Sequence, residues 1–113
     1  MKKLIAVVLF APCMAWAEFY TGNDLYMKIT DENSMVNRMV ATGYVVGVYD
    51  VGAHLFFCPP KPESGITVGQ ISDMVKNWLA VNAHRRNELA YSLITDLFSK
   101  NWPCANKKNG VGV

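Results

Sequence analysis

The N-terminal segment constrains this chain most, because it decides in which compartment the rest of the sequence folds. Two lysines follow the first methionine of the 113-residue sequence, an apolar run comes next, and an Ala-Trp-Ala triplet ends at Ala17, directly before Glu18. A positive start, an apolar centre and a small-residue A-x-A site are the three parts of a secretory signal peptide. The apolar run is shorter than the roughly 18 residues that a membrane-spanning helix needs. The sequence therefore predicts export and cleavage between Ala17 and Glu18.

Removal of the predicted signal peptide, residues 1–17, leaves one small domain over residues 18–104 and a polar tail over residues 105–113 that we expect to be flexible. Lys2 and Lys3 account for the formal net charge of +2, so the exported chain is formally neutral. It has no basic stripe, which argues against a nucleic-acid partner. The expected location is the periplasm, without a membrane segment once the signal peptide is removed.

Export also limits what the cysteines can do. Cys13 leaves with the signal peptide, so Cys58 and Cys104 remain in an oxidising compartment, where disulfides form and persist. A bridge between them would close a loop of about 47 residues and stabilise the fold by roughly 4 kcal/mol in the chain-entropy model. Two other roles of Cys58 are a nucleophile, with His54 as its base, and a metal ligand. Because no C-x-x-C or H-x-x-x-H pair supports a metal site, the disulfide is the favoured hypothesis.

Helical periodicity dominates the exported part of the sequence, so we predict an all-α bundle of about four helices with one disulfide. Thr67 and Gln70 have capping-box spacing, and apolar residues follow them at the three-and-four spacing of one helix face. This pattern predicts a helix over residues 68–81. A shorter helix is expected over residues 23–30.

Two more segments complete the predicted bundle. A wide apolar stripe over residues 89–98 predicts a last helix that opens within HRRNELA and ends before Pro103. The segment 34–56 is harder to assign, because its valines favour strand while its apolar residues recur four apart. We predict a long helix there, with a bent helix or a partial strand as the alternative. Gly43 and Gly47 share one face of that helix, where small residues let a second helix approach closely.

The sequence contains no motif that supports catalysis. A G-x-S-x-G elbow and a glycine-rich phosphate loop are both absent from it. Asp50 falls among apolar residues, which indicates either a buried structural carboxylate or part of a binding site. The expectation is therefore a binding protein without enzymatic activity, metal or cofactor.

Several short segments stand in a characteristic order between Gly22 and Cys104, namely TGNDLY, GYVVGVYD, FFCPP, GITVGQISDMVKNWL, HRRNELA and NWPC. Together they resemble the type VI amidase immunity family, the Tai or Rap-type immunity proteins. The resemblance implies an exported helical domain, often dimeric, that binds a peptidoglycan-cleaving cysteine amidase delivered by a type VI secretion system and blocks its active site. It also matches Cys58 and Cys104 to the family's cysteines. An additional cysteine pair of many relatives is missing here.

Contacts with such an amidase should come from a protruding loop that fits a cleft. The loop 59–65, stiffened by three prolines, is the first candidate, and the turn 83–87 is the second. The residues expected to contact the partner are Pro60, Lys61, Glu63, Ser64, His84 and Arg85. The alternative functions are a small periplasmic chaperone or stress protein for unfolded clients and an orphan, phage-borne binding protein of the same fold.

Overall fold

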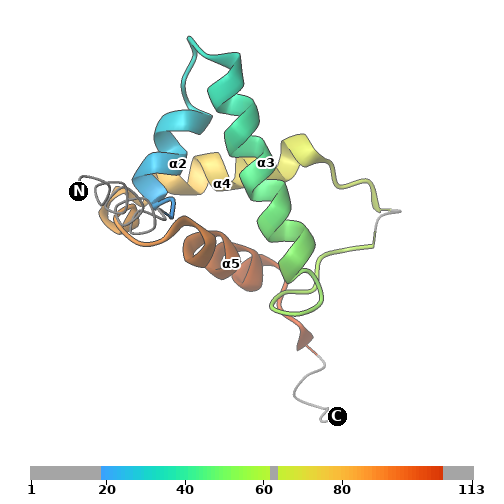
Figure 1. Ribbon diagram of the computed structural model, residues 1–113. Coiled ribbons are helices and arrows are strands. Elements are labelled where there is room, and N and C mark those ends of the chain that lie inside the picture. Colours follow the sequence, from blue (N-terminus) through green and yellow to red (C-terminus); the bar gives the residue numbers. More distant parts are fainter. Residues whose placement is uncertain (1–18, 62–63, 106–113) are drawn as a thin grey trace, which may run out of the picture.

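The computed structural model describes residues 19–61 and 64–105, which form four α-helices (Figure 1). They are α2 (Gly22–Ile29), α3 (Met35–Gly52), α4 (Val68–Val81) and α5 (Ala90–Asn101), with a short 3-10 helix, η3 (Ala83–Arg85), before the last. This part of the chain contains isolated β-bridges but no strand, so the predicted all-α fold is confirmed. The predicted signal peptide, its cleavage site and the tail after Ala105 lie outside the described residues.

Side-chain caps explain where α2 and α4 begin. The Thr67 hydroxyl accepts a hydrogen bond from the Gln70 amide at 3.1 Å, and the Gln70 side chain accepts one from the Thr67 amide at 2.8 Å. Thr21 and Asp24 form the same capping box at the start of α2. Each box satisfies amide groups that a helix start otherwise leaves without a partner. Helix α4 has the predicted bounds, and α2 lies one residue earlier than predicted.

Helix α3 ends four residues before its predicted end. It follows a side-chain cap at Ser34, as expected, but stops at Gly52. The Gly52 carbonyl accepts hydrogen bonds from the amides of residues 55 and 56, and His54 has a left-handed backbone with φ of 67°. This turn places Phe57 in the core, where it is fully buried. The predicted continuation to residue 56 is therefore wrong, and so is the partial strand.

Helix α5 begins at Ala90, the last residue of the predicted opening segment HRRNELA, because the residues before it run across the start of α2. The Gly22 amide donates to the Glu88 carbonyl at 2.9 Å, and the next amide of α2 donates to the Arg86 carbonyl at 2.7 Å. A Cβ atom at Gly22 would lie 2.9 Å from the Arg86 Cα, so this close approach requires glycine. Hydrogen bonds between distant segments thus replace the first turn of the predicted helix.

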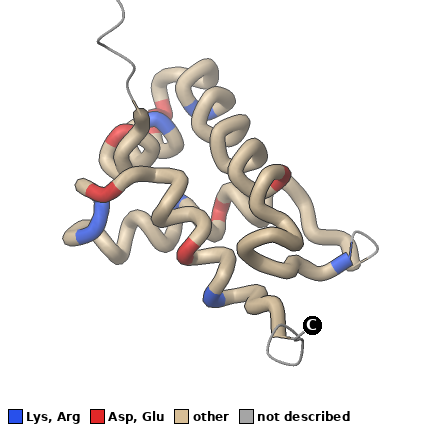
Figure 2. Tube along the Cα trace, turned by 60° about the horizontal axis from the view of Figure 1, so that its bottom comes forward, with Lys and Arg blue, Asp and Glu red and all other residues tan. Residues whose placement is uncertain are grey.

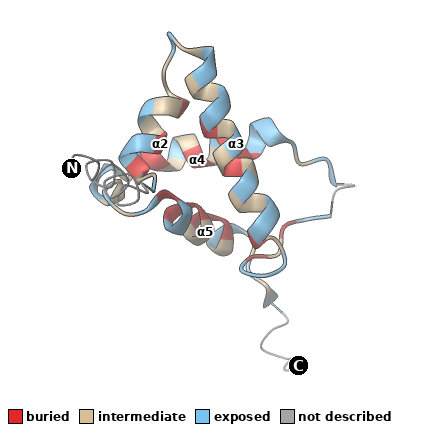
Figure 3. Cartoon of the chain, viewed as in Figure 1, coloured by how far each residue is buried: buried red, intermediate tan, exposed pale blue. Residues whose placement is uncertain are grey.

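The core lies where the four helices meet, and Figure 3 shows buried residues on the facing sides of all four. A group of aromatic rings closes one end of it. The ring centroid of Phe98 lies 5.2 Å from those of Phe57 and Trp102, and 5.8 Å from that of Tyr49. Such pairs stabilise by about 0.5 to 1.5 kcal/mol beyond their burial. This aromatic cluster joins the end of α3, the turn after it and the end of α5, and so positions the segment that carries Cys58.

Candidate partner-binding surfaces

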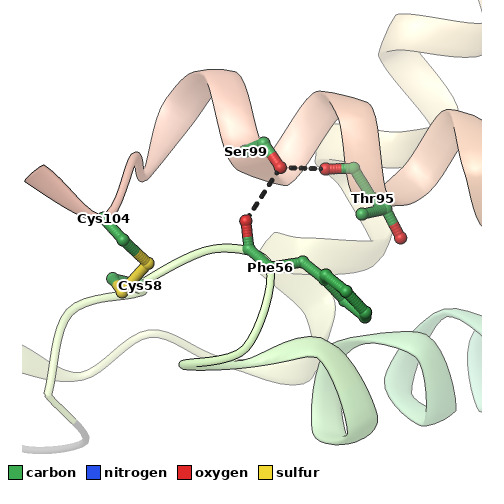
Figure 4. The surroundings of a disulfide bond; sticks show 5 residues. All are labelled: Phe56, Cys58, Thr95, Ser99 and Cys104. Atoms are coloured by element: carbon green, nitrogen blue, oxygen red, sulfur yellow. Dashed lines mark hydrogen bonds between the residues drawn. A yellow bond between two sulfur atoms is a disulfide. The ribbon is translucent and has the colours of Figure 1, made fainter. Parts of the chain in front are cut away.

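Cys58 and Cys104 form a disulfide bond, with their Cα atoms 4.9 Å apart (Figure 4). The predicted covalent link between the segments that follow α3 and α5 is confirmed. The bond leaves no thiolate at Cys58, which excludes the nucleophile hypothesis, and His54 lies on the turn after α3 instead of on a shared helix face. Among residues 19–61 and 64–105, no group of His, Cys, Asp and Glu side chains is arranged to hold a metal ion.

Hydrogen bonds hold the same junction. The Cys58 amide donates to the Trp102 carbonyl at 2.8 Å. The Ser99 hydroxyl lies 3.1 Å from the Phe56 carbonyl oxygen and 2.7 Å from the Thr95 carbonyl oxygen (Figure 4). Since a hydroxyl carries one hydrogen, the two carbonyls share it. The segment after α3 is therefore fixed to the end of α5 by hydrogen bonds as well as by the disulfide.

The loop 59–65, the first predicted contact region, is here called the contact loop. Pro59 is buried, whereas Pro60, Lys61 and Ser64 are exposed. The Lys61 carbonyl accepts hydrogen bonds from the Ser64 amide at 2.8 Å and from the Ser64 hydroxyl at 2.6 Å, which join the two described parts of the loop. Glu63, also predicted to contact a partner, lies outside the described residues. The loop is thus buried at its first residue, Pro59, and exposed at Pro60, Lys61 and Ser64.

Cavities lie on both sides of the contact loop. One, of about 330 Å³, opens toward the end of α3, and its lining includes Tyr49, Asp50, His54 and Pro60. The other, of about 540 Å³, opens toward α4, and its lining includes Ser64, Gln70, Asp73 and Asn77. The Asp50 residue is exposed, so the prediction of a buried structural carboxylate is wrong, and its role in a binding site stays a prediction.

The second candidate surface, the turn 83–87, contains an ion-pair network. The Arg85 guanidinium donates to both carboxylate oxygens of Glu88 at 2.9 and 3.0 Å, and it lies 3.4 Å from an Asp96 oxygen. His84 is exposed. A partner that used Arg85 would have to compete with these two carboxylates, whereas His84 is accessible without breaking an ion pair.

The Arg85–Glu88 pair leads to a pH-dependent prediction. Hydrogen bonding from Arg85 lowers the pKa of Glu88 below its ordinary value of 4.5. A lowered pKa in the folded state stabilises the fold above pH 4.5, and this stabilisation is lost as the pH falls through the folded-state pKa. Glu88→Gln is therefore expected to lower the midpoint of thermal unfolding at neutral pH and to have no effect once Glu88 is protonated. Thermal melts across this pH range test it, with Glu32→Gln, on an exposed turn, as the control. A Glu88→Gln effect that persists unchanged in acid would contradict it.

The outward side of α3 forms a third surface, here called the outer face of α3. It consists of Val36, Met39, Val40, Gly43, Gly47, Asp50 and Val51, all of them exposed, and Asp50 is the charged residue among them. A Cβ atom at Gly43 or Gly47 would meet no atom within 4 Å, so the predicted close approach of another helix does not occur within the described chain. Helix α3 carries only two charged residues, and Figure 2 shows how sparse charge is along it. No described helix is long and apolar enough to cross a membrane.

The comparison with protein families agrees with this architecture. The family model of the Rap1a immunity proteins matches residues 21–104, from the capping threonine of α2 to the second cysteine of the disulfide. No curated protein matches the chain. The family match covers well over half of the 113 residues and includes every described helix. The chain therefore belongs to the Rap1a immunity protein family.

Proposed function

We propose that the protein is a periplasmic immunity protein that binds a peptidoglycan-cleaving amidase of a type VI secretion system and inhibits it by occluding its active site. The family match over residues 21–104 carries this proposal. The resemblance of the segments from TGNDLY to NWPC to the amidase immunity proteins supports the narrower choice of toxin. Such an inhibitor acts by binding and needs no catalytic group, metal or cofactor of its own.

The proposed location is the periplasm, where peptidoglycan is exposed to a delivered amidase. The N-terminal segment has the three parts of an export signal. The disulfide supports the same location, because such bonds persist in oxidising compartments. In this proposal cleavage follows Ala17, residues 18–104 form the immunity domain, and residues 105–113 form a flexible tail.

The contact loop is the proposed site of amidase binding. Its base is held by the disulfide and by the hydrogen bond from the Cys58 amide to the Trp102 carbonyl, while Lys61 and Ser64 are exposed. Proline fixes one backbone dihedral, so the prolines of this loop reduce the conformational freedom that binding removes. Pro60, Lys61 and Ser64 are exposed, and two cavities adjoin the loop, which suits insertion into an active-site cleft. The proposed contacts are Pro60, Lys61, Glu63 and Ser64, with His84 and Arg85 as a second region.

Charge reversal at the loop tip tests this assignment. Lys61→Glu is expected to weaken inhibition of the amidase by about tenfold or more, because it reverses the charge of a side chain within the proposed contact. The companion variant is His84→Glu, which introduces the same side chain in the second proposed contact region, the turn 83–87. Residues 61 and 84 are both exposed, so the variants should keep the wild-type unfolding midpoint. Unchanged inhibition by Lys61→Glu would exclude the loop tip, and a loss confined to His84→Glu would move the contact to the turn.

The cognate amidase can be identified by a pull-down with the tagged exported protein, residues 18–113, from its own host with the secretion system active. The proposal requires one stoichiometric partner that cleaves peptidoglycan and that stops cleaving when this protein is added. Many weakly bound proteins would instead favour the chaperone hypothesis, which the exposed apolar outer face of α3 supports. In that case the protein should suppress aggregation of unfolded clients and should not stop peptidoglycan cleavage.

We also propose that the protein forms a homodimer, as its resemblance to the often dimeric amidase immunity proteins implies. The outer face of α3 supports this proposal, because it is largely apolar and no part of the described chain covers it.

A further inference from the structure

We infer that a cavity between α2, α3 and α4 binds a small oxyanion, a carboxylate or phosphate group, through Arg38, Lys76 and Ser72. The cavity has a volume of about 260 Å³. Neither the contact loop nor the turn 83–87 contributes to its lining. The site goes beyond the proposed function, because an anion binds to it without any toxin.

A buried hydroxyl without a partner indicates a ligand in this cavity. Ser72 lines the cavity and is 8% exposed, and its Oγ atom has no hydrogen-bond partner among the described residues. Buried polar atoms are normally hydrogen-bonded, because an unpaired one loses its bonds to water without replacement. A serine inside a helix often donates to a carbonyl of its own helix, and Ser72 does not. An oxygen acceptor in the cavity accepts the hydrogen that Ser72 otherwise leaves unused.

Two cations line the same cavity, and neither forms an ion pair with a described residue. The Arg38 guanidinium donates from one nitrogen to the Asp31 carbonyl at 2.7 Å, which leaves its other N–H groups for a ligand. Lys76 is half-buried and has no carboxylate partner in the described chain. Like charges on one cavity repel each other, and an anion between them is attracted to both. The planar guanidinium matches the paired oxygens of a carboxylate or phosphate group.

The remaining charge at the cavity favours an anion over a cation. Asp73 is the one carboxylate of the described lining and is exposed, so the two cations outnumber it. Gly69 brings the first turn of α4 to the cavity, and the positive end of a helix dipole stabilises negative charge. Thr42 of α3 supplies a second hydroxyl. The lining therefore combines two cations with two hydroxyl donors, which together suit a group with several acceptor oxygens.

The anion has two sources of the same chemistry, a carboxylate side chain of the amidase and a free anion. Both present oxygen acceptors and negative charge, which is what the lining recognises. Variants of Ser72 and Lys76 test the site itself, and inhibition of the amidase then distinguishes the two sources.

Ser72→Ala separates anion binding from folding. Alanine is a better helix former than serine, and the change removes an unpaired buried hydroxyl, so the variant should not unfold at a lower temperature than wild type. Its affinity for inorganic phosphate should still fall by about threefold or more, because one donor to the anion is lost. A serine with a purely structural role would not produce this loss.

Lys76→Gln removes one of the two cations and should weaken phosphate binding by about tenfold, since hydrogen bonds to charged groups are the stronger ones. Lys100→Gln is the matched control. It makes the same change of net charge at an exposed lysine of α5 that does not line the cavity. The control should bind phosphate like wild type.

The measurement is an NMR titration of the exported protein, residues 18–113, with inorganic phosphate and separately with acetate, at neutral pH and constant ionic strength. Backbone amide shifts around Gly69, Ser72 and Lys76 should change and saturate in the millimolar range, as expected for a ligand of so few atoms. Saturation by one probe alone supports the site and narrows its anion to that class. Shifts that do not saturate, or that occur equally around every Lys and Arg, overturn the inference. So does binding by Lys76→Gln and Ser72→Ala that equals that of wild type.

Inhibition of the amidase by the same variants identifies the source of the anion. If Lys76→Gln inhibits about tenfold more weakly and Lys100→Gln inhibits like wild type, a carboxylate of the amidase occupies the cavity. If both inhibit like wild type while phosphate or acetate binding depends on Lys76, the anion is a free one. A wild type that binds the probe but inhibits no amidase contradicts the proposed function and supports the site, so the two failures are distinguishable.

Discussion

Replacing Cys58 and Cys104 together by serine is expected to lower the free energy of unfolding by about 4 kcal/mol. The two cysteines are 46 residues apart in sequence, and cross-linking a loop of this length removes a corresponding amount of entropy from the unfolded chain. Natural domains are stable by only about 5 to 15 kcal/mol, so the loss is a large part of the total. Denaturant unfolding of the oxidised wild type and of the double variant, at the same pH and protein concentration, measures it.

The folded structure of the serine variant should persist, because other contacts hold the same junction. The Cys58 position keeps its backbone hydrogen bond to the Trp102 carbonyl, and the Ser99 hydroxyl still reaches the Phe56 carbonyl. Ser99→Ala is the matched control, since it removes a noncovalent contact at this junction and should cost about 1 kcal/mol. If the double serine variant loses no more stability than Ser99→Ala, the disulfide does not stabilise the fold through the unfolded chain.

The parts of the fold that could be predicted are those that neighbouring residues determine. The capping pair of Thr67 and Gln70 sets the start of α4 within four residues of sequence, and the structure has the predicted helix. The end of α3 and the start of α5 depend on distant segments instead. Phe57 turns into a core built by other helices, and carbonyls of the turn 83–89 bond to the amides that open α2. No local pattern contains such contacts, which is why the end of α3 was predicted at the wrong residue and the start of α5 was predicted only to within the segment HRRNELA.

Some features of the candidate surfaces could likewise be predicted from the sequence, and others could not. The pairing of Cys58 with Cys104 follows from counting cysteines after export, and the structure confirms it. The exposure of Asp50 and the ion pairs of Arg85 could not be predicted, because they depend on which side of a helix the rest of the chain covers. Helix α3 shows most clearly that the sequence alone does not determine which side of a helix is buried. Its sequence is apolar on two opposite sides, and periodicity alone does not tell which side faces the core and which remains free.

Phe57→Ala is expected to lower the free energy of unfolding by about 3 to 5 kcal/mol. Phe57 is fully buried, and its ring centroid lies 5.2 Å from that of Phe98 and 5.9 Å from that of Tyr49. Truncation would leave a cavity where α3, the turn after it and α5 meet. Leu55→Ala is the matched control, because Leu55 lies two residues earlier and is 67% exposed, so its truncation should cost less than about 0.5 kcal/mol. Denaturant unfolding of both variants tests this, and equal losses would contradict the assigned burial.

Phe57 should also affect inhibition, because it directly precedes Cys58 at the base of the contact loop. Removal of its ring loosens that base even with the disulfide intact, so Phe57→Ala should weaken inhibition of the amidase at temperatures where the variant is still folded. The double serine variant keeps Phe57 and the hydrogen bond to Trp102, so it should still inhibit below its own unfolding temperature. These two variants lose similar stability for different reasons. If inhibition fails only when the disulfide is absent, the covalent link, and not the aromatic cluster, positions the loop.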